Sequence, residues 1–149
     1  MTPNRDGASA LFPVAAIAPA TLSADNTPDA IDVRGYQSAT LNLSIGVGGI
    51  TFTGSNKIEF VLTHSDDGVT YTAVTDDDVI KDALAPATIT SGIVRALTAA
   101  HAAATLQELG YIGGKGYLKL LADFSGTHGT GTPVSAVVVR SNAALKGVA

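Results

Sequence analysis

The feature that most constrains the fold is an alternation of apolar and polar residues that begins at Ile31 and recurs along the chain. A period of two places one set of side chains on each face of a β-strand, so it predicts strands with one buried side and one solvent-facing side. In the first run the apolar members are Ile31, Val33, Leu41, Leu43 and Ile45, and the polar members are Asp32, Arg34, Thr40, Asn42 and Ser44. Gly35 predicts an interruption within this run.

A β-hairpin is predicted around Asp67-Gly68. The alternation continues through Ile50, Phe52, Ile58, Phe60 and Leu62 before it reaches Ser65-Asp66-Asp67-Gly68. An Asp-Gly pair between two β-rich runs, here residues 61–63 and 69–71, is the strongest short hairpin signal in the sequence. We therefore expect an antiparallel connection at this point.

The second half of the chain carries further strand signals. Residues 89–97 indicate a strand around Gly92, and residues 117–124 again alternate. Residues 133–140 are rich in valine and apolar on both parities, which is typical of a strand covered on both faces. Pro133 is compatible with the first position of such a strand.

The segment between residues 76 and 105 is ambiguous. Three aspartates at 76–78 predict a loop with a short helical turn. Residues 98–109 are alanine-rich and helical by propensity, but the glycines that follow favour a strand from about 105 to 112. Short strands separated by turn signals, without strand–helix alternation, predict an all-β fold: an antiparallel, jelly-roll-like β-sandwich.

The 149 residues fit one domain, with an arm, a body and a tail. Prolines at 3, 13, 19 and 28 exclude a long helix from residues 1–28, which we interpret as an extended N-terminal arm; a disordered leader is the alternative. Residues 29–140 are the predicted sandwich, and 141–149 a C-terminal tail. The arm would bind a neighbouring subunit by strand addition or apolar insertion. Its candidate binding residues are Leu11, Phe12, Val14, Ile17 and Leu22.

Charge and composition argue against several partners. The net charge is −4, and the nine basic residues are scattered singly, so we expect no nucleic-acid binding. No apolar run is long enough to span a membrane, and the N-terminus lacks the order of a signal peptide, so we expect a protein made in the cytoplasm. The chain has no cysteine, and only 15% of its residues are charged. Low charge suits a surface that other protein covers.

No motif predicts catalysis, a metal or a cofactor. The three histidines, at 64, 101 and 128, do not stand at metal-ligand spacing, and there is no Gly-x-Ser-x-Gly elbow. Turn chemistry is the favoured explanation of the acidic residues between Asp66 and Asp82, with a cation site as the alternative. The glycine-rich stretches 46–49 and 113–116 lack the spacing of phosphate loops. We therefore expect a protein that is not an enzyme.

Several segments, in order, resemble the head decoration, or capsid cement, proteins of tailed bacteriophages. The resemblance covers about residues 29–140 and rests on five stretches: Ala30-Ile31-Asp32-Val33-Arg34-Gly35-Tyr36, Gly49-Ile50-Thr51-Phe52, His64-Ser65-Asp66-Asp67-Gly68-Val69-Thr70-Tyr71-Thr72-Ala73-Val74, Gly110-Tyr111-Ile112-Gly113-Gly114-Lys115-Gly116-Tyr117-Leu118 and Phe124-Ser125-Gly126-Thr127. It implies a non-enzymatic virion protein on the outer capsid surface, made in the host cytoplasm, that cements neighbouring subunits of the major capsid protein. It also implies a homo-oligomer, with a trimer expected by analogy.

Two other functions stay open at this stage. A tail or adaptor component of the same kind of virion would share the fold and the low charge. A jelly-roll carbohydrate-binding module would need exposed aromatic platforms, for which Tyr36, Tyr111 and Tyr117 are the candidates.

Overall fold

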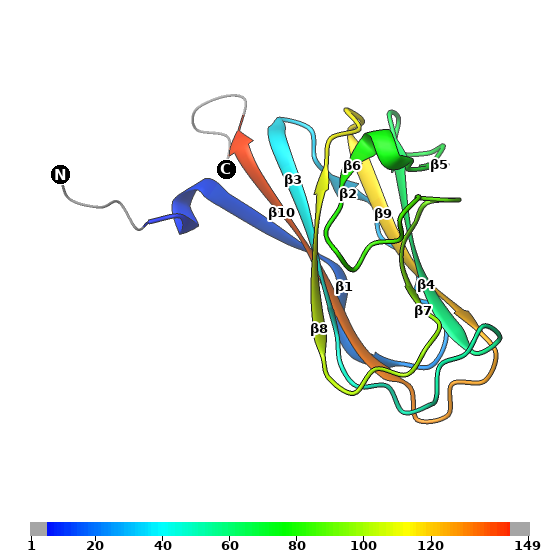
Figure 1. Ribbon diagram of the computed structural model, residues 1–149. Helices are drawn as coiled ribbons and strands as arrows, with labels where there is room; N and C mark the ends of the chain where they lie inside the picture. The colour runs from blue at the N-terminus through cyan, green and yellow to red at the C-terminus, as the bar shows by residue number, and fades with distance from the viewer. Residues whose placement is uncertain (1–5, 144–149) are drawn as a thin grey trace.

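Ten strands and two 3₁₀ turns make up the described part of the chain, residues 6–143 of a computed structural model (Figure 1). In chain order they are η1 (Ala8–Ala10), β1 (Leu11–Leu22), β2 (Ile31–Asp32), β3 (Tyr36–Ile45), β4 (Lys57–Ser65), β5 (Thr72–Ala73), η2 (Asp76–Asp78), β6 (Val79–Ile80), β7 (Ile93–Leu97), β8 (Thr105–Tyr111), β9 (Tyr117–Ser125) and β10 (Thr132–Ala143). No helix in this part of the chain is long and apolar enough to cross a membrane.

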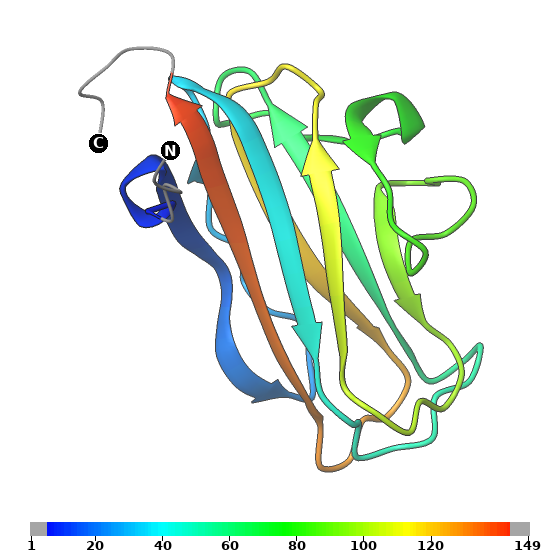
Figure 2. The ribbon, with the colours of Figure 1, turned by 60° about the vertical axis from the view of Figure 1, so that its left-hand side comes forward.

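The strands form two antiparallel sheets that face each other (Figures 1 and 2). Sheet A has the order β1-β10-β3-β8-β6, and sheet B has the order β2-β9-β4-β5, with β7 also paired to β4. The pairing is nested: β1 pairs with β10, β2 with β9, β3 with β8, and β4 with β5 and β7. Nested pairing of this kind is a long hairpin wrapped into a double-sheet jelly roll. The predicted all-β, jelly-roll-like sandwich is confirmed.

The core lies between the sheets and is built by the alternation that the sequence shows. From sheet A, Leu41, Leu43 and Ile45 point inward; from sheet B, Phe60 and Leu62 do. All of these side chains are at most 3% exposed. Burying such side chains is the main stabilising contribution in a sandwich of this size.

Local turn chemistry places the strand ends. Gly35 has a φ of +83°, which strongly favours glycine, and it separates β2 from β3 as expected. The hairpin at Asp67-Gly68 joins β4 to β5 through residues 66–71. One carboxylate oxygen of Asp67 accepts hydrogen bonds from the backbone N–H groups of Val69 and Thr70, both at 2.8 Å. The hairpin is confirmed, with a longer loop than a two-residue turn.

Along one edge of β9 only the two-residue strand β2 pairs with it, and beyond β2 side chains form hydrogen bonds with the β9 backbone. The Asn26 amide donates to the carbonyl of Leu120 at 3.2 Å and accepts from the N–H of Ala122 at 2.7 Å. Asp25 accepts from the N–H of Phe124 at 2.7 Å. These groups take the place of a neighbouring strand and blunt an edge that would otherwise pair with another chain.

Residues 11–22, assigned to an extended arm by the sequence, are extended but belong to the sandwich. They form β1, the edge strand of sheet A, which pairs along its length with β10. The proposed arm boundary at residue 28 is therefore wrong for these residues, because their apolar side chains complete the chain's own core. Residues 141–143 likewise continue β10 instead of starting the tail. Residues 1–5 of the arm and 144–149 of the tail lie outside the described residues.

Two strand assignments also differ from expectation. Residues 50–53 form no strand, and β7 begins at Ile93 because Ser91 and Gly92, with φ of 53° and 77°, make a turn before it. The strand predicted at 105–112 is confirmed as β8, and the helical turn at 76–78 is η2. In β10 only one face is fully buried, so the prediction that both faces are covered is wrong.

Candidate functional site

The predicted binding residues of the arm lie partly in the core and partly at the surface. Ile17 is a core residue, 5% exposed, and Val14 and Leu22 pack against the core. The ring of Phe12 lies 5.4 Å from that of Tyr36, measured between centroids. Leu11, 45% exposed, is the member of the set that remains most available to a partner.

The free edge of β1 is poorly suited to strand addition. Pro13 and Pro19 lie on this edge strand, and proline cannot donate to a sheet ladder. The register of β1 with β10 also shifts twice, between Ala15 and Ile17 and between Ile17 and Ala20. Prolines and bulges are two devices by which proteins protect sheet edges from pairing.

The outer side of sheet A, turned to the viewer in Figure 2, carries almost no charge. Its residues alternate with the buried ones, and we call this surface the neutral face. It consists of Leu11, Pro13 and Ala15 on β1, Pro133, Ser135, Val137, Val139 and Ser141 on β10, Ser38, Thr40, Asn42 and Ser44 on β3, Leu106, Glu108 and Gly110 on β8, and Ile80 on β6. Glu108 is the one charged residue in this set.

A hollow and a protruding side chain lie close together on the neutral face. The hollow has a volume of about 360 Å³ and no charged residue in its walls. Its lining residues are Pro19, Ala20, Thr21, Ser44, Gly46, Ala104, Pro133, Val134 and Ser135. Leu106, 68% exposed, lies directly across the strand pair from Ser44. The face therefore offers both a cavity and an apolar side chain able to fill one.

The outer side of sheet B is different, and we call it the charged face. Its outward residues on β4 and β9 are Lys57, Glu59, Val61, Thr63, Tyr117, Lys119, Leu121 and Asp123. The Nζ atom of Lys57 lies 2.7 Å from Oε1 of Glu59. The ammonium of Lys119 lies 4.4 Å from the ring centre of Tyr71, which is a cation–π contact. Such side chains are satisfied among themselves and remain in contact with water.

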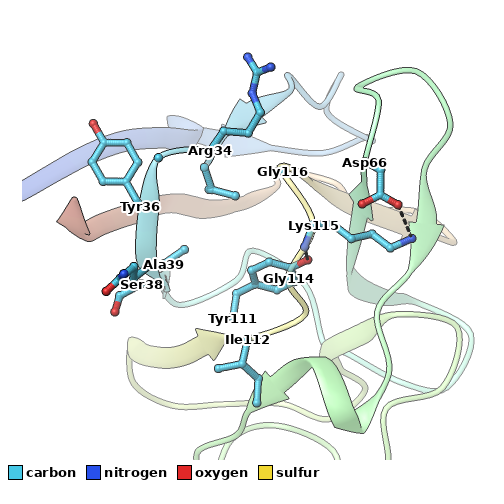
Figure 3. Close-up of a pocket in the computed structure, with 13 residues that line it drawn as sticks. Arg34, Tyr36, Ser38, Ala39, Asp66, Tyr111, Ile112, Gly114, Lys115 and Gly116 are labelled. Atoms are coloured by element: carbon cyan, nitrogen blue, oxygen red, sulfur yellow. Dashed lines mark hydrogen bonds and ion pairs between the residues drawn. The ribbon is translucent and has the colours of Figure 1, made fainter. Parts of the chain in front are cut away.

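A groove of about 580 Å³ opens at one end of the sandwich, between the start of β3 and the β8–β9 turn (Figure 3). Lys115 in this turn points toward Asp66, with Nζ 3.6 Å from Oδ2. Arg34 points away from the groove, donates to both carboxylate oxygens of Asp32 and stacks on Tyr117. Lys115 and Arg34 therefore each have an acidic partner within the chain.

Beneath this groove a buried polar contact joins the two sheets. The Nδ1 atom of His64, on β4, lies 2.8 Å from the hydroxyl of Tyr111, on β8. That hydroxyl also accepts the backbone N–H of Lys115 at 3.1 Å. Burial lowers the pKa of His64, an effect that the carboxylate of Asp78, 4.0 Å from Nε2, partly opposes. The imidazole is therefore neutral at neutral pH, and its contact with Tyr111 links the two sheets.

The other histidines have structural contacts as well. The Nε2 atom of His101 lies 2.8 Å from the carbonyl oxygen of Gly46, and that of His128 lies 2.8 Å from the carbonyl of Ser125. Both rings pack against Phe52. The three histidines thus lie in separate contacts, with no serine hydroxyl bonded to any of them among residues 6–143.

The acidic stretch is organised by turn and cap contacts. Asp78 accepts from the backbone N–H of Thr75 at the start of η2, and Asp82 accepts from the N–H of Leu84 and of Glu108. Asp76 pairs with Lys81. Within the described residues, no three histidine or carboxylate side chains are placed to hold a metal ion.

The tyrosines considered as a carbohydrate platform are occupied within the chain. Tyr111 is 8% exposed, Tyr117 is covered by Arg34, and Tyr36 is covered by Arg140 at 4.8 Å from its ring centre. The sequence did not single out the neutral face, because its members come from five strands that are distant in the chain. Comparison of the chain with protein-family models, with curated proteins and with solved structures finds no match.

Proposed function

We propose that this protein is a non-enzymatic structural component of a tailed-bacteriophage head, which binds the outer capsid surface and holds neighbouring major capsid subunits together. The observation that carries the proposal is the chemical difference between the two outer faces of one sandwich. A cementing protein must contact more than one neighbour, and two unlike faces on one rigid body suit two unlike contacts.

The side-chain contacts support binding over chemistry. The polar groups that a catalyst would use are engaged in turns, caps and sheet-to-sheet contacts, as His64, Asp67 and Asp82 illustrate. The sequence resemblance over residues 29–140 supplies the choice of a phage head as the assembly. The carbohydrate-binding alternative is weakened because its aromatic candidates are covered by Arg34 and Arg140.

The test is an electron cryo-microscopy map of the intact particle, combined with cosedimentation of the purified protein with capsids that lack it. We expect density for the sandwich on the outer shell, over the seams between capsid subunits, and saturable cosedimentation. Density confined to the tail or connector would favour the tail or adaptor function. Failure of the protein to bind any part of the particle would contradict both.

A further inference from the structure

We infer that two copies of this chain pair face to face through the neutral face of sheet A. The inference rests on the proposed function in one respect, since it assigns a partner to a surface already taken as an assembly contact. The capsid would then be reached by the charged face or by the loops at the ends of the sandwich.

The near absence of charge on the neutral face favours a partner surface that also carries almost no charge. Of the outward residues on five strands, only Glu108 is ionised, and it lies on β8 near one side of the sheet. A partner with an ordinary charged surface would bury its ions here without counter-charges, which is costly. A second neutral face brings almost no charge, so the like face of another copy avoids this cost.

The size of the face is sufficient. Five strands about 4.8 Å apart and roughly nine residues long, at about 3.3 Å per residue, span roughly 20 Å by 30 Å. Two such faces would bury about 1,200 Å² in total, which lies at the lower end of the range for specific interfaces. Small side chains such as Ser44, Ser135 and Ala15 allow two sheets to approach closely.

The shape of the neutral face also suits contact between two identical copies. An interface between identical copies related by a two-fold axis must be self-complementary, so a projection and its receiving hollow must lie on the same patch. The neutral face has both: Leu106 protrudes, and the 360 Å³ hollow opens beyond Ser44 on the neighbouring strand. Pairing through the edge of β1 is disfavoured by Pro13 and Pro19, so the face is the available surface of this sheet.

The experiment measures self-association of the purified full chain by analytical ultracentrifugation, without capsids. We expect a reversible dimer that Leu106→Asp and Ser44→Asp each weaken on the order of 100-fold, because each places a like charge on both sides of the contact. The matched control is Val69→Asp, at a side chain 82% exposed in the β4–β5 loop, which should dimerise like the unmodified chain.

Two further measurements separate a lost contact from a damaged fold. A mixture of Ser44→Asp and Ser44→Lys copies should dimerise more tightly than either variant alone. Since the chain has no cysteine, Leu106→Cys should cross-link to a second copy with a short bismaleimide, and Val69→Cys should not. A monomeric unmodified chain overturns the inference, as does any dimer or trimer that persists in both face variants.

Cosedimentation with capsids is measured separately from self-association. Face variants that lose pairing yet still cosediment with capsids support the inference and leave the proposed function intact. A chain that pairs through the face but binds no part of the particle supports the inference and contradicts the proposed function.

Discussion

The two outer faces of the sandwich have the same backbone geometry and opposite chemistry. Both sheets bury alternate residues in one core, so both inner faces must be apolar. The outward residues need not be apolar. On sheet B they include Lys57 and Glu59, which form an ion pair, and Lys119, which contacts the ring of Tyr71. On sheet A they are mostly small, hydroxylated or apolar. The difference teaches that sheet A is the side that can lose its water with almost no burial of charge.

One core holds both outer faces in place, and the substitution Phe60→Ala in that core should have the largest effect on stability. Phe60 is fully buried between the sheets, so its truncation should lower the free energy of unfolding by about 3–5 kcal/mol. Denaturant titration followed by circular dichroism measures the change. The neighbouring Val61→Ala, on the outer side of β4, should cost less than about 1 kcal/mol. Separate unfolding transitions for the two sheets would break the comparison.

The next largest effect concerns whether β1 belongs to sheet A. Ile17→Ala should lower the free energy of unfolding by about 2–5 kcal/mol, because Ile17 is 5% exposed in the core. Leu11→Ala on the same strand should change it by no more than about 0.5 kcal/mol. Equal and small effects in chemical denaturation would show that β1 is an arm after all, and would remove its residues from the neutral face.

The link between the sheets at the grooved end should be weaker but measurable. Tyr111→Phe removes the hydroxyl that lies between His64 Nδ1 and the N–H of Lys115, and leaves both without this partner. We expect the free energy of unfolding to fall by about 1–3 kcal/mol. Thermal unfolding measures this, and an unchanged midpoint would mean that the contact does not hold the sheets together.

Acid should loosen the same contact. Because burial lowers the pKa of His64 in the folded chain, its neutral form stabilises the fold fully above the unfolded pKa of about 6.5. That contribution is lost as the pH falls from there through the folded pKa. The charged groups that act on the ring are Asp78 and Asp66, which oppose the lowering of the His64 pKa, and Lys115, which adds to it. His64→Gln should flatten the stability profile just below pH 6.5; a profile unchanged by this substitution would contradict the prediction.

The smallest expected effect is on the charged face itself. Lys57→Ala should lower the free energy of unfolding by about 0.2–1 kcal/mol, since its ion pair with Glu59 is only partly shielded from water. The loss should shrink as salt is added to the unfolding experiment. Ser44→Ala on the neutral face should show no such salt dependence. Equal salt responses would mean that the two faces do not differ electrostatically.

Much of the fold follows from local pattern. The alternation beginning at Ile31, the break at Gly35, the hairpin at Asp67-Gly68 and the strand Thr105–Tyr111 were all predictable, because side-chain period and turn residues act within a few positions. The boundaries of β7 and the irregular residues 50–53 were not. In these segments Ile89 lies in the core and Ile50 packs against it, although both belong to loops. Periodicity does not distinguish such a loop residue from one in a strand.

The sequence by itself determined most of the strands from Ile31 onward, the antiparallel fold class and the lack of a catalytic motif. Only the tertiary structure decided where residues 11–22 lie, since an extended apolar segment reads the same whether it pairs with its own chain or with a neighbour. The neutral face was also decided there. It exists because β1, β10, β3, β8 and β6, distant in sequence, become adjacent in sheet A, and strand adjacency is set by long-range pairing that no local pattern encodes.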